Sequence, residues 1–279
     1  MTNFRSDRIL TLYFFYPLVK KTFFTHKPSI PILMYHSISE KKEDTVHPYY
    51  CINTTPEIFY THMIFLRENS YSVINLNEAL QILRKPTYPS KRYAVITFDD
   101  GYRDFYNEAF PILKDYGYTA TVFLPTGYIS DNRLSFKKKG CLTWDEVRQL
   151  HNQGISFGSH SITHSELQSL KYNDLQYEIQ KSKETIENKI GAKVESFCYP
   201  SRFPEEKRNF IIYLRNLLRK NGYGHGVSTR IGTTSQNDDS YFMKRIPINS
   251  MDDISFLKAK LEDGYNWLYH IQRLKKIFM

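Results

Sequence analysis

The feature that most constrains the fold is a regular alternation of strand-like and helix-like segments from residue 30 onward. About eight apolar segments of strand length are separated by segments with helical periodicity, an order that favours a parallel sheet covered by helices. A chain of 279 residues is long enough to close such a sheet. We therefore predict an α/β fold, a closed or nearly closed (β/α) barrel of about seven to eight parallel strands in a single domain, in preference to an open doubly wound sheet. The expected strands are residues 30–36, 71–76, 92–98, 118–125, 155–160, 194–200, 224–229 and 243–248.

Local signals mark where several helices begin. Thr55 and Pro56 fit the N-cap and the first position of a helix. Thr143 and Glu146 have the spacing of a capping box, in which each side chain accepts a hydrogen bond from the other residue's backbone. The expected helices are residues 55–69, 77–84, 103–116, 143–154, 172–190, 205–221 and 251–262.

Composition places the chain among folded globular proteins. Hydrophobic residues make up 41% and charged residues 24% of the chain. Lys and Arg outnumber acidic residues by 38 to 29, and the net charge of +9 favours an anionic partner over a cationic one. The basic residues are scattered, however, and no nucleic-acid-binding signature accompanies them, so we expect no nucleic-acid partner. The 22 Tyr and 19 Phe residues suit a core, and some of them suit a sugar-binding cleft.

The N-terminal segment is apolar and aromatic over residues 9–19, with Arg5 and Arg8 before it and Lys20 and Lys21 after it. This run of roughly eleven residues is shorter than the ~20 that span a bilayer, and no small-residue cleavage site follows it. Two interpretations fit. One is a helix packed on the domain, and the other is an interfacial anchor that gives peripheral membrane contact through residues 9–21.

The chain shows no linker long enough to separate two large domains. We expect an N-terminal segment at 1–29, one main domain at 30–262 and a C-terminal amphipathic helix at 263–279. The three cysteines, at positions 51, 141 and 198, are widely spaced and form no CxxC pair. They indicate no disulfide framework, and a reducing compartment fits them best.

Residues capable of catalysis follow three of the expected strands. The strand at 92–98 ends in Asp99 and Asp100, the strand at 155–160 leads into His160 and His164, and the first strand ends at His36. Barrel enzymes place their chemistry at the carboxyl ends of the strands, so these side chains are expected to meet on one rim.

This set of residues indicates a metal site. His160 and His164 are four positions apart, a spacing that one turn of helix would place on the same face. Two imidazoles and one carboxylate give a divalent metal three protein ligands and leave a position for water. A second carboxylate beside the metal can then act as a general base, because the cation compensates the repulsion between Asp99 and Asp100. The plainer alternatives are an exposed acidic turn and a structural histidine pair.

Three segments resemble the motifs of the polysaccharide deacetylases, the carbohydrate esterase group with the NodB homology domain. They are "TFDDGYRD" (97–104), "SHSITH" (159–164) and "FCYPSRF" (197–203), and the similarity covers roughly residues 30–250. The resemblance implies that Asp99 is the general base and that Asp100, His160 and His164 bind a divalent metal, usually zinc. It also implies a distorted (β/α) barrel.

The third motif departs from the family pattern, because Ser201 and Arg202 stand where a glycine usually follows the Tyr-Pro pair. The resemblance implies that the backbone N–H of Ser201 helps to bind the oxyanion. Arg202 is a candidate for contact with the substrate or with a phosphate, and the substrate-binding candidates are completed by Tyr199 and Pro200.

A second resemblance indicates which residue is the general acid. The segment "PILMYHS" (31–37) is similar to the opening strand of the circularly permuted branch, which includes bacterial poly-N-acetylglucosamine deacetylases. This similarity implies that His36 protonates the leaving amine, and a structural role is the alternative. Arg245 opens a late strand and is expected to pair with Asp99, which would keep that carboxylate ionised. His270 lies in an amphipathic helical stretch and is expected to be a surface or packing residue.

The sequence thus predicts a metal-dependent hydrolase that removes N-acetyl groups from an amino sugar of a surface polysaccharide or its lipid-linked precursor. One alternative keeps the barrel and the metal but changes the substrate to a small cyclic amide or a peptide-like C–N bond. Another is a non-catalytic glycan-binding relative. The expected location is the bacterial cytoplasm or the surface of the cytoplasmic membrane, and secretion or periplasmic exposure stays open.

Overall fold

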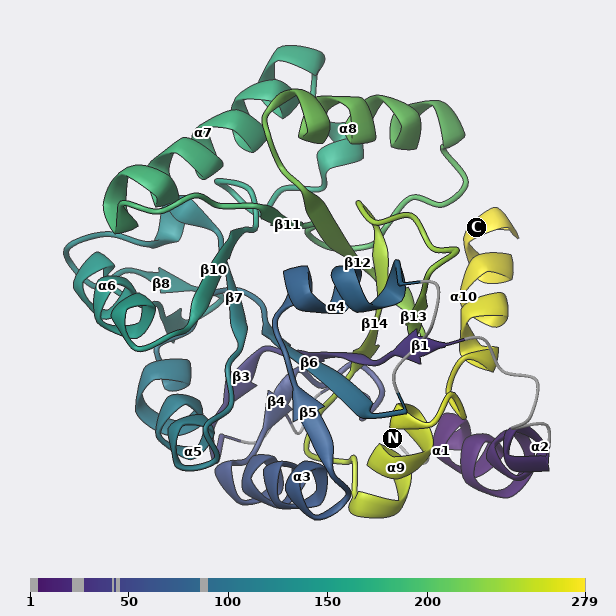
Figure 1. Ribbon diagram of the computed structural model, residues 1–279. Coiled ribbons are helices and arrows are strands. Elements are labelled where there is room, and N and C mark those ends of the chain that lie inside the picture. The colour runs from purple at the N-terminus through teal and green to yellow at the C-terminus, as the bar shows by residue number, and fades with distance from the viewer. Residues whose placement is uncertain (1–4, 22–27, 42, 44–45, 86–89, 279) are drawn as a thin grey trace.

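The computed structural model describes residues 5–21, 28–41, 43, 46–85 and 90–278. Seven parallel strands form a closed barrel, which confirms the predicted fold class (Figure 1). Each strand of the ring pairs with the next, and β2 closes it by pairing with both β14 and β6. Around the ring the strands are β2 (Ile32–Tyr35), β14 (Met243–Pro247), β12 (His225–Ile231), β11 (Ser196–Cys198), β10 (Ser156–Ser159), β7 (Thr121–Leu124) and β6 (Arg92–Phe98).

An eighth parallel strand, β5 (Tyr71–Val73), lies outside the ring on β6. It pairs with residues 92–94 of β6, whereas β7 pairs with residues 97–98. β5 is shorter than the expected strand because Asn75 is already the N-cap of α4 (Leu76–Leu83), in a capping box with Glu78. Within the described residues, three two-stranded sheets complete the strands: β1 (Ser29–Ile30) with β13 (Thr234–Ser235), β3 (Ser37–Ile38) with β4 (Asn53–Thr54), and β8 (Ser135–Phe136) with β9 (Lys139–Gly140).

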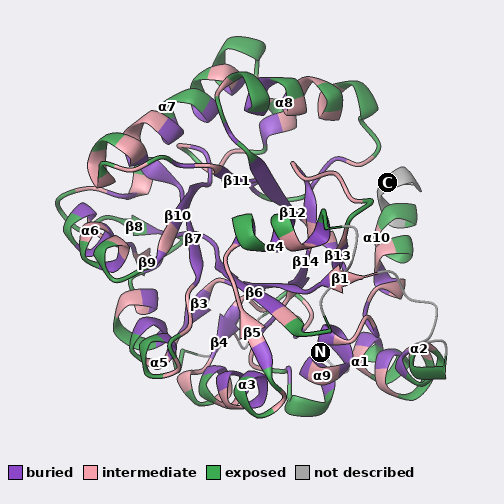
Figure 2. Cartoon of the chain, viewed as in Figure 1, coloured by how far each residue is buried: buried purple, intermediate pink, exposed green. Residues whose placement is uncertain are grey.

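Helices surround the ring, and their solvent-facing sides are exposed while the strands are buried (Figure 2). The predicted caps are present, with Thr55 and Thr143 accepting hydrogen bonds from the third helical residues of α3 and α6. The helices are α3 (Pro56–Glu68), α5 (Phe110–Asp115), α6 (Trp144–Asn152), α7 (Tyr172–Ile190), α8 (Arg208–Lys220), α9 (Ile254–Leu261) and α10 (Trp267–Phe278).

The helix expected over 103–116 differs from a regular α-helix. It begins with a π-turn, η3 (Phe105–Ala109), and only then continues as α5. Pro111 explains the change, because proline has no N–H to donate to the carbonyl of Asn107 four residues earlier.

The interior of the barrel is filled by apolar side chains from the strands and is closed at one mouth by α4. Figure 1 shows α4 lying across the ring, and its apolar residues belong to the same core cluster as the inward-facing strand residues. Gly158 on β10 is required here, because a Cβ at this position would lie 2.4 Å from the ring of Phe123. The catalytic candidates lie at the opposite mouth, where the strands end.

The N-terminal segment is helical and packs on the domain. It comprises α1 (Ser6–Leu10), the π-turn η1 (Thr11–Phe15) and α2 (Tyr16–Lys21). The ring of Phe15 stacks on Trp267 of α10 at 4.5 Å, and Trp267 Nε1 donates to Thr11 Oγ1 at 3.0 Å. His270 of α10 is exposed, as expected. None of the helices in the described ranges combines the length and the apolar character needed to cross a bilayer.

Candidate metal and catalytic site

The strand ends bring the predicted residues to one rim of the barrel. Asp99 and Asp100 follow β6, His160 follows β10 and His36 follows β2. The backbone N–H of Asp99 donates to the carbonyl of Tyr35 at 3.0 Å, so the pairing of β2 with β6 extends to the site. Backbone pairing between β2 and β6 therefore fixes the positions of Asp99 and Asp100 at the end of β6.

Asp100, His160 and His164 converge on one point. Asp100 Oδ1 lies 3.2 Å from His164 Nε2 and 3.6 Å from His160 Nε2, and the three ligand atoms lie within 4.8 Å of one another. Among the described residues, Asp100 Oδ1 is buried without a hydrogen-bond partner. A buried carboxylate oxygen that faces two imidazole nitrogens fits a divalent metal ion, which commonly takes these three ligands.

His160 is held in the form that binds a metal. Its Nδ1–H donates to the carbonyl oxygen of Cys198 at 2.9 Å, which leaves the lone pair on Nε2 directed at Asp100. Burial lowers the pKa of His160 to about 4, although the carboxylate of Asp99 acts in the opposite sense. The imidazole is therefore neutral at pH 7, as metal binding requires.

A second group of metal-ligand type, Asp99 with His160 and Cys198, shares one histidine with the first. Its other two members are already engaged. Asp99 accepts two hydrogen bonds from Arg245, and burial raises the pKa of the Cys198 thiol well above its usual value. A protonated thiol and a carboxylate paired with a guanidinium are poor ligands. The group containing Asp100 is thus the better metal site.

The prediction that one turn of helix carries His160 and His164 was wrong. Residues 160–166 form a loop, in which Ser161 has φ +62° and His164 has φ +57°. Ser161 Oγ accepts a hydrogen bond from the backbone N–H of His164 at 3.1 Å. Two left-handed residues, rather than helical periodicity, turn the two imidazoles toward each other. Such conformations are strained for residues with a side chain and are found at functional sites.

Glu178 on α7 holds this loop in place, and the sequence analysis did not single it out. One carboxylate oxygen accepts from the backbone N–H groups of Ile162 at 2.7 Å and Thr163 at 3.0 Å. The other accepts from the hydroxyl of Thr163 at 2.7 Å. The side chain is buried. Its only local signal is an acidic residue on the polar helix at 172–190, which does not distinguish it from its neighbours.

We expect Glu178→Ala to weaken metal binding by about 10- to 100-fold, because residues that orient metal ligands typically contribute this much. The loop would lose three hydrogen bonds and the left-handed turn that they support. Competition with a chelating dye measures the affinity. Asp174→Ala, at an exposed acidic position in the first turn of the same helix, serves as the control and should leave the affinity unchanged. Equal affinities for both variants would contradict the anchoring role.

Asp99 and Arg245 form the expected pair, buried just inside this rim of the barrel. Arg245 Nη1 lies 2.7 Å from Asp99 Oδ1 and Nη2 lies 2.7 Å from Oδ2, and Arg245 is 1% exposed. The remaining N–H groups donate to the carbonyl of Ser228, the hydroxyl of Thr97 and the sulfur of Cys198, so all five donors are satisfied. Burial would raise the pKa of Asp99, but the charge and hydrogen bonds of Arg245 outweigh it and hold the pKa at about 2.

His36 lies beside this pair on the same rim. Its Nε2 is 3.9 Å from Asp99 Oδ2, and its side chain is partly exposed, in contrast to that of Asp99. Burial lowers the pKa of His36, while the charges of Asp99 and Asp100 act in the opposite sense. The imidazole is thus within reach both of solvent and of the candidate base.

The second oxygen of Asp100 is bound by residues that the sequence analysis did not single out. Tyr102 donates its hydroxyl to Oδ2 at 2.9 Å, and the ammonium group of Lys137 lies 3.4 Å from the same oxygen. Lys137 and Lys138 form the turn between β8 and β9 with φ +47° and +65°. Asparagine and glycine usually occupy such turns.

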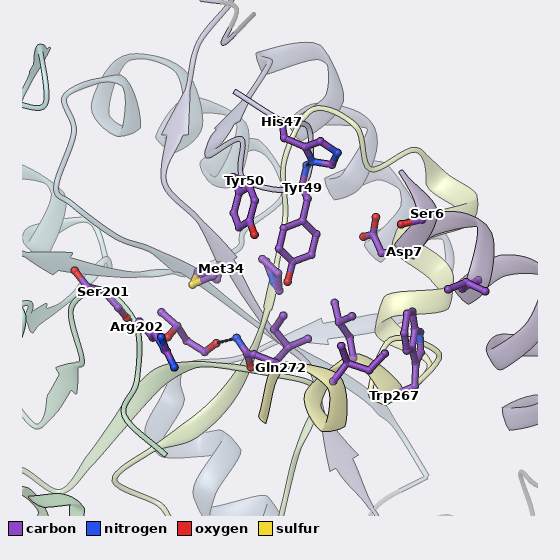
Figure 3. Close-up of a pocket in the computed structure, with 16 residues that line it drawn as sticks. Ser6, Asp7, Met34, His47, Tyr49, Tyr50, Ser201, Arg202, Trp267 and Gln272 are labelled. Atoms are coloured by element: carbon purple, nitrogen blue, oxygen red, sulfur yellow. Dashed lines mark hydrogen bonds between the residues drawn. The ribbon is translucent and has the colours of Figure 1, made fainter. Parts of the chain in front are cut away.

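The third motif reaches the rim only in part. Tyr199 and Pro200 are buried, and the Tyr199 ring packs against Phe203 at 5.1 Å. Their side chains can therefore shape the loop but present no exposed surface to a substrate. Ser201, with φ +60°, and Arg202 are exposed and line a cavity beside the site (Figure 3).

Comparison with known proteins shows which family the sequence matches. The sequence model of the polysaccharide deacetylase family matches residues 87–223. A Bacillus subtilis protein named as a polysaccharide deacetylase, YxkH, is 33% identical over 227 residues, which cover 81% of this chain and 74% of that protein. The poly-beta-1,6-N-acetyl-D-glucosamine N-deacetylase of Staphylococcus aureus is 26% identical over 75% of this chain and 71% of its own length.

Two solved structures share the fold. The Streptococcus pyogenes deacetylase PplD, solved in complex with acetate, superposes with a TM-score of 0.72 at 24% identity and covers 85% of this chain and 99% of its own. IcaB from Ammonifex degensii superposes with a TM-score of 0.66 at 16% identity, over 84% of this chain and 97% of its own. At these identities, the likeness concerns the barrel.

Proposed function

This chain belongs to the polysaccharide deacetylase family, and from that premise we propose that it removes N-acetyl groups from an amino sugar of a surface polysaccharide or its lipid-linked precursor. The single observation that best supports the proposal is the pair of adjacent carboxylates with separate partners. Asp100 faces two imidazoles, and Asp99 is held by a buried guanidinium. One carboxylate is therefore available as a metal ligand and the other as a base.

Asp100, His160 and His164 would hold a divalent metal ion, for which we propose zinc. Two imidazoles and a carboxylate are a donor set typical of catalytic zinc. When bound, the ion would act as a Lewis acid and lower the pKa of water. Tyr102 and Lys137 bind the other oxygen of Asp100 and so orient its free oxygen toward the histidines.

The chain's own groups account for both proton transfers. Asp99 is ionised at neutral pH, because Arg245 holds its pKa at about 2, and it accepts a proton from the attacking water. As the C–N bond breaks, the protonated form of His36 donates a proton to the leaving amine, and acetate is released; Asp99 then passes the proton taken from water to His36. The 3.9 Å separation of His36 and Asp99 keeps the acid beside the base. The backbone N–H of Ser201 is the proposed donor to the developing oxyanion.

Removal of the metal should abolish acetate release. Chelator-treated protein is expected to lose more than about 90% of its activity on N-acetylglucosamine oligomers and to recover it when a stoichiometric divalent cation is added. Acetate assays together with elemental analysis of the protein as purified test the proposal. Full activity in metal-free protein, or ring opening of small cyclic amides without acetate release from the oligomers, would contradict it.

His36→Gln should lower kcat on N-acetylated sugars by about 10²- to 10⁴-fold, the usual contribution of a general acid. A phenyl acetate ester, whose leaving group needs no proton, should be affected much less. Kinetics on both substrates at equal metal content make the comparison. His270→Gln, an exposed histidine on α10, is the matched control. Equal losses on amide and ester would argue against the acid role.

A further inference from the structure

A cavity of about 830 Å³ opens beside the candidate site, a size within the range of small-molecule binding sites. Its walls come from the ends of β2, β12 and β14, the loop at 47–50, α1 and α10. Figure 3 shows Ser201 and Arg202 on one side of it, Trp267 on the other and Met34 between them. The proposed reaction uses only the side with Ser201, which leaves most of the cavity without a role.

One end of the cavity is lined by two residues that lie next to the site in the fold. Ser201 lines it and is the proposed oxyanion donor. Met34 also lines it and lies on β2, two residues before His36. Arg202 is an exposed cation at this end. The acidic lining residue Asp7 is neutralised, because it pairs with Arg5 and accepts a hydrogen bond from Tyr265. A ligand that fills the cavity would thus end at the Ser201–Arg202 loop, beside the exposed guanidinium of Arg202.

The other end of the cavity is mostly apolar. It is lined by Leu10 of α1 and by Trp267, Leu268 and Ile271 of α10, and Figure 3 shows Ser6 and Asp7 of α1 on the same side. Sugar hydroxyl groups buried against such side chains would lose hydrogen bonds to water without replacing them, which is costly. A hydrocarbon chain would instead gain from the same contacts. The lining therefore changes from polar at the site to apolar away from it, as an amphiphilic ligand requires.

The apolar end leads to an exposed apolar surface, which we call the apolar rim. Leu10 and Ile271 line the cavity and are themselves 44% and 39% exposed. The rest of the rim lies on the same two helical segments, which pack together through Trp267. Exposed cations, Lys20, Lys21 and Arg273, lie on these segments as well. The apolar rim consists of Ile9, Leu10, Tyr13, Phe14, Leu18, Ile271 and Leu274.

We propose that the cavity binds the hydrocarbon chain of a lipid-linked N-acetylamino sugar, with the linking phosphate at Arg202 and the sugar at the metal site. This inference rests on the proposed function and narrows its substrate to the lipid-linked class. An apolar surface flanked by cations suits the surface of an anionic bilayer, where such a substrate resides. The apolar rim thus lies where the chain leaves the cavity for the membrane.

The test compares two substrates with the same reacting sugar, the methyl and the decyl phosphodiesters of N-acetylglucosamine 1-phosphate, below the micelle concentration of the latter. The expected kcat/KM is at least roughly tenfold higher for the decyl ester, the effect of burying a few methylene groups. Equal kcat/KM values would overturn the inference. A rise with the number of sugar units in chain-free oligomers, and none with the alkyl chain, would also overturn it and assign the cavity to a glycan.

Variants of the 279-residue chain show which residues cause the chain-length effect. In Leu10→Asn/Ile271→Asn, the decyl-to-methyl ratio of kcat/KM should fall toward one, mainly through KM. Ile212→Asn changes a similarly exposed isoleucine on α8 and should keep the wild-type ratio. Arg202→Gln should reduce the preference for the decyl phosphodiester over the uncharged decyl glycoside. An unchanged ratio in the double variant would overturn the inference.

A binding measurement can test the assignment of the cavity independently of the proposed deacetylase function. Calorimetric titration with decyl phosphate should show saturable binding that methyl phosphate does not give and that the double variant weakens at least roughly tenfold. Chain-dependent binding without acetate release from either ester would refute the deacetylase function and leave the cavity assignment standing. Acetate release without chain-dependent binding or kinetics would support the deacetylase function and refute the assignment of the cavity to a hydrocarbon chain.

Discussion

Asp99→Asn and Asp100→Asn should both inactivate the protein, but for different reasons. We expect Asp99→Asn to keep its metal and to lose about 10²- to 10⁴-fold in kcat, because an amide cannot accept the proton of the attacking water. Asp100→Asn should instead lose metal, because a neutral amide replaces the carboxylate that faces His160 and His164. Elemental analysis and acetate release, measured on the same preparations, separate the two outcomes.

A double variant controls for unfolding in the comparison of Asp99→Asn with Asp100→Asn. Asp99→Asn leaves the charge of Arg245 buried with a weakened partner, so loss of activity could follow from unfolding. The double variant Asp99→Asn/Arg245→Met removes both charges and should be folded, metal-loaded and inactive. Metal loss in Asp99→Asn together with metal retention in Asp100→Asn would reverse the assigned roles.

The convergence of the candidate residues on one rim was predictable because it depends on strand ends. Asp99, Asp100, His160 and His36 each follow a strand of the barrel, and parallel strands end on the same rim. Identifying the strands is therefore enough to bring these residues together. The pairing of Arg245 with Asp99 was also expected, but not from strand ends, because Arg245 lies in the middle of β14.

The geometry of the second motif could not be read in the same way. The spacing of His160 and His164 predicted a turn of helix, whereas the structure uses a loop with left-handed residues. That loop is stabilised by Glu178, which lies on a helix whose polar pattern marks many positions equally. Contacts between a loop and a distant helix leave no periodic signal in the sequence. Lys137 was missed for a similar reason, because its approach to Asp100 depends on the β8–β9 turn.

Arg245→Met should be the most destabilising of the substitutions considered for this site. Removing one partner of a buried ion pair leaves an uncompensated charge and typically costs about 3–5 kcal/mol in the free energy of unfolding. Urea denaturation of the metal-free protein measures the loss. Arg148→Met, which removes a partly exposed arginine paired with Asp145 on α6, should change the free energy of unfolding by less than about 1 kcal/mol.

The free energy of unfolding lost in Arg245→Met should also depend on pH. In the wild-type chain, the pKa of Asp99 is about 2, below the ~3.9 of an unfolded aspartate, so its ionisation stabilises the fold above about pH 4. That stabilisation disappears as the pH falls toward about 2. Without Arg245, burial raises the pKa of Asp99 above its unfolded value, and stability then falls as the pH rises above about 4. The difference in the free energy of unfolding between wild type and Arg245→Met should therefore be larger at about pH 7 than at about pH 4.

A double-mutant cycle decides whether this pair is the cause. Asp99→Asn/Arg245→Met leaves no charge in the barrel interior at these two positions, so it should recover much of the stability lost in Arg245→Met and lose the additional pH dependence. Strictly additive losses would mean that packing of the arginine side chain, rather than charge pairing with Asp99, stabilises the barrel. In the cycle expected here, the arginine that keeps the base ionised for catalysis is also the group that makes a buried carboxylate compatible with the fold.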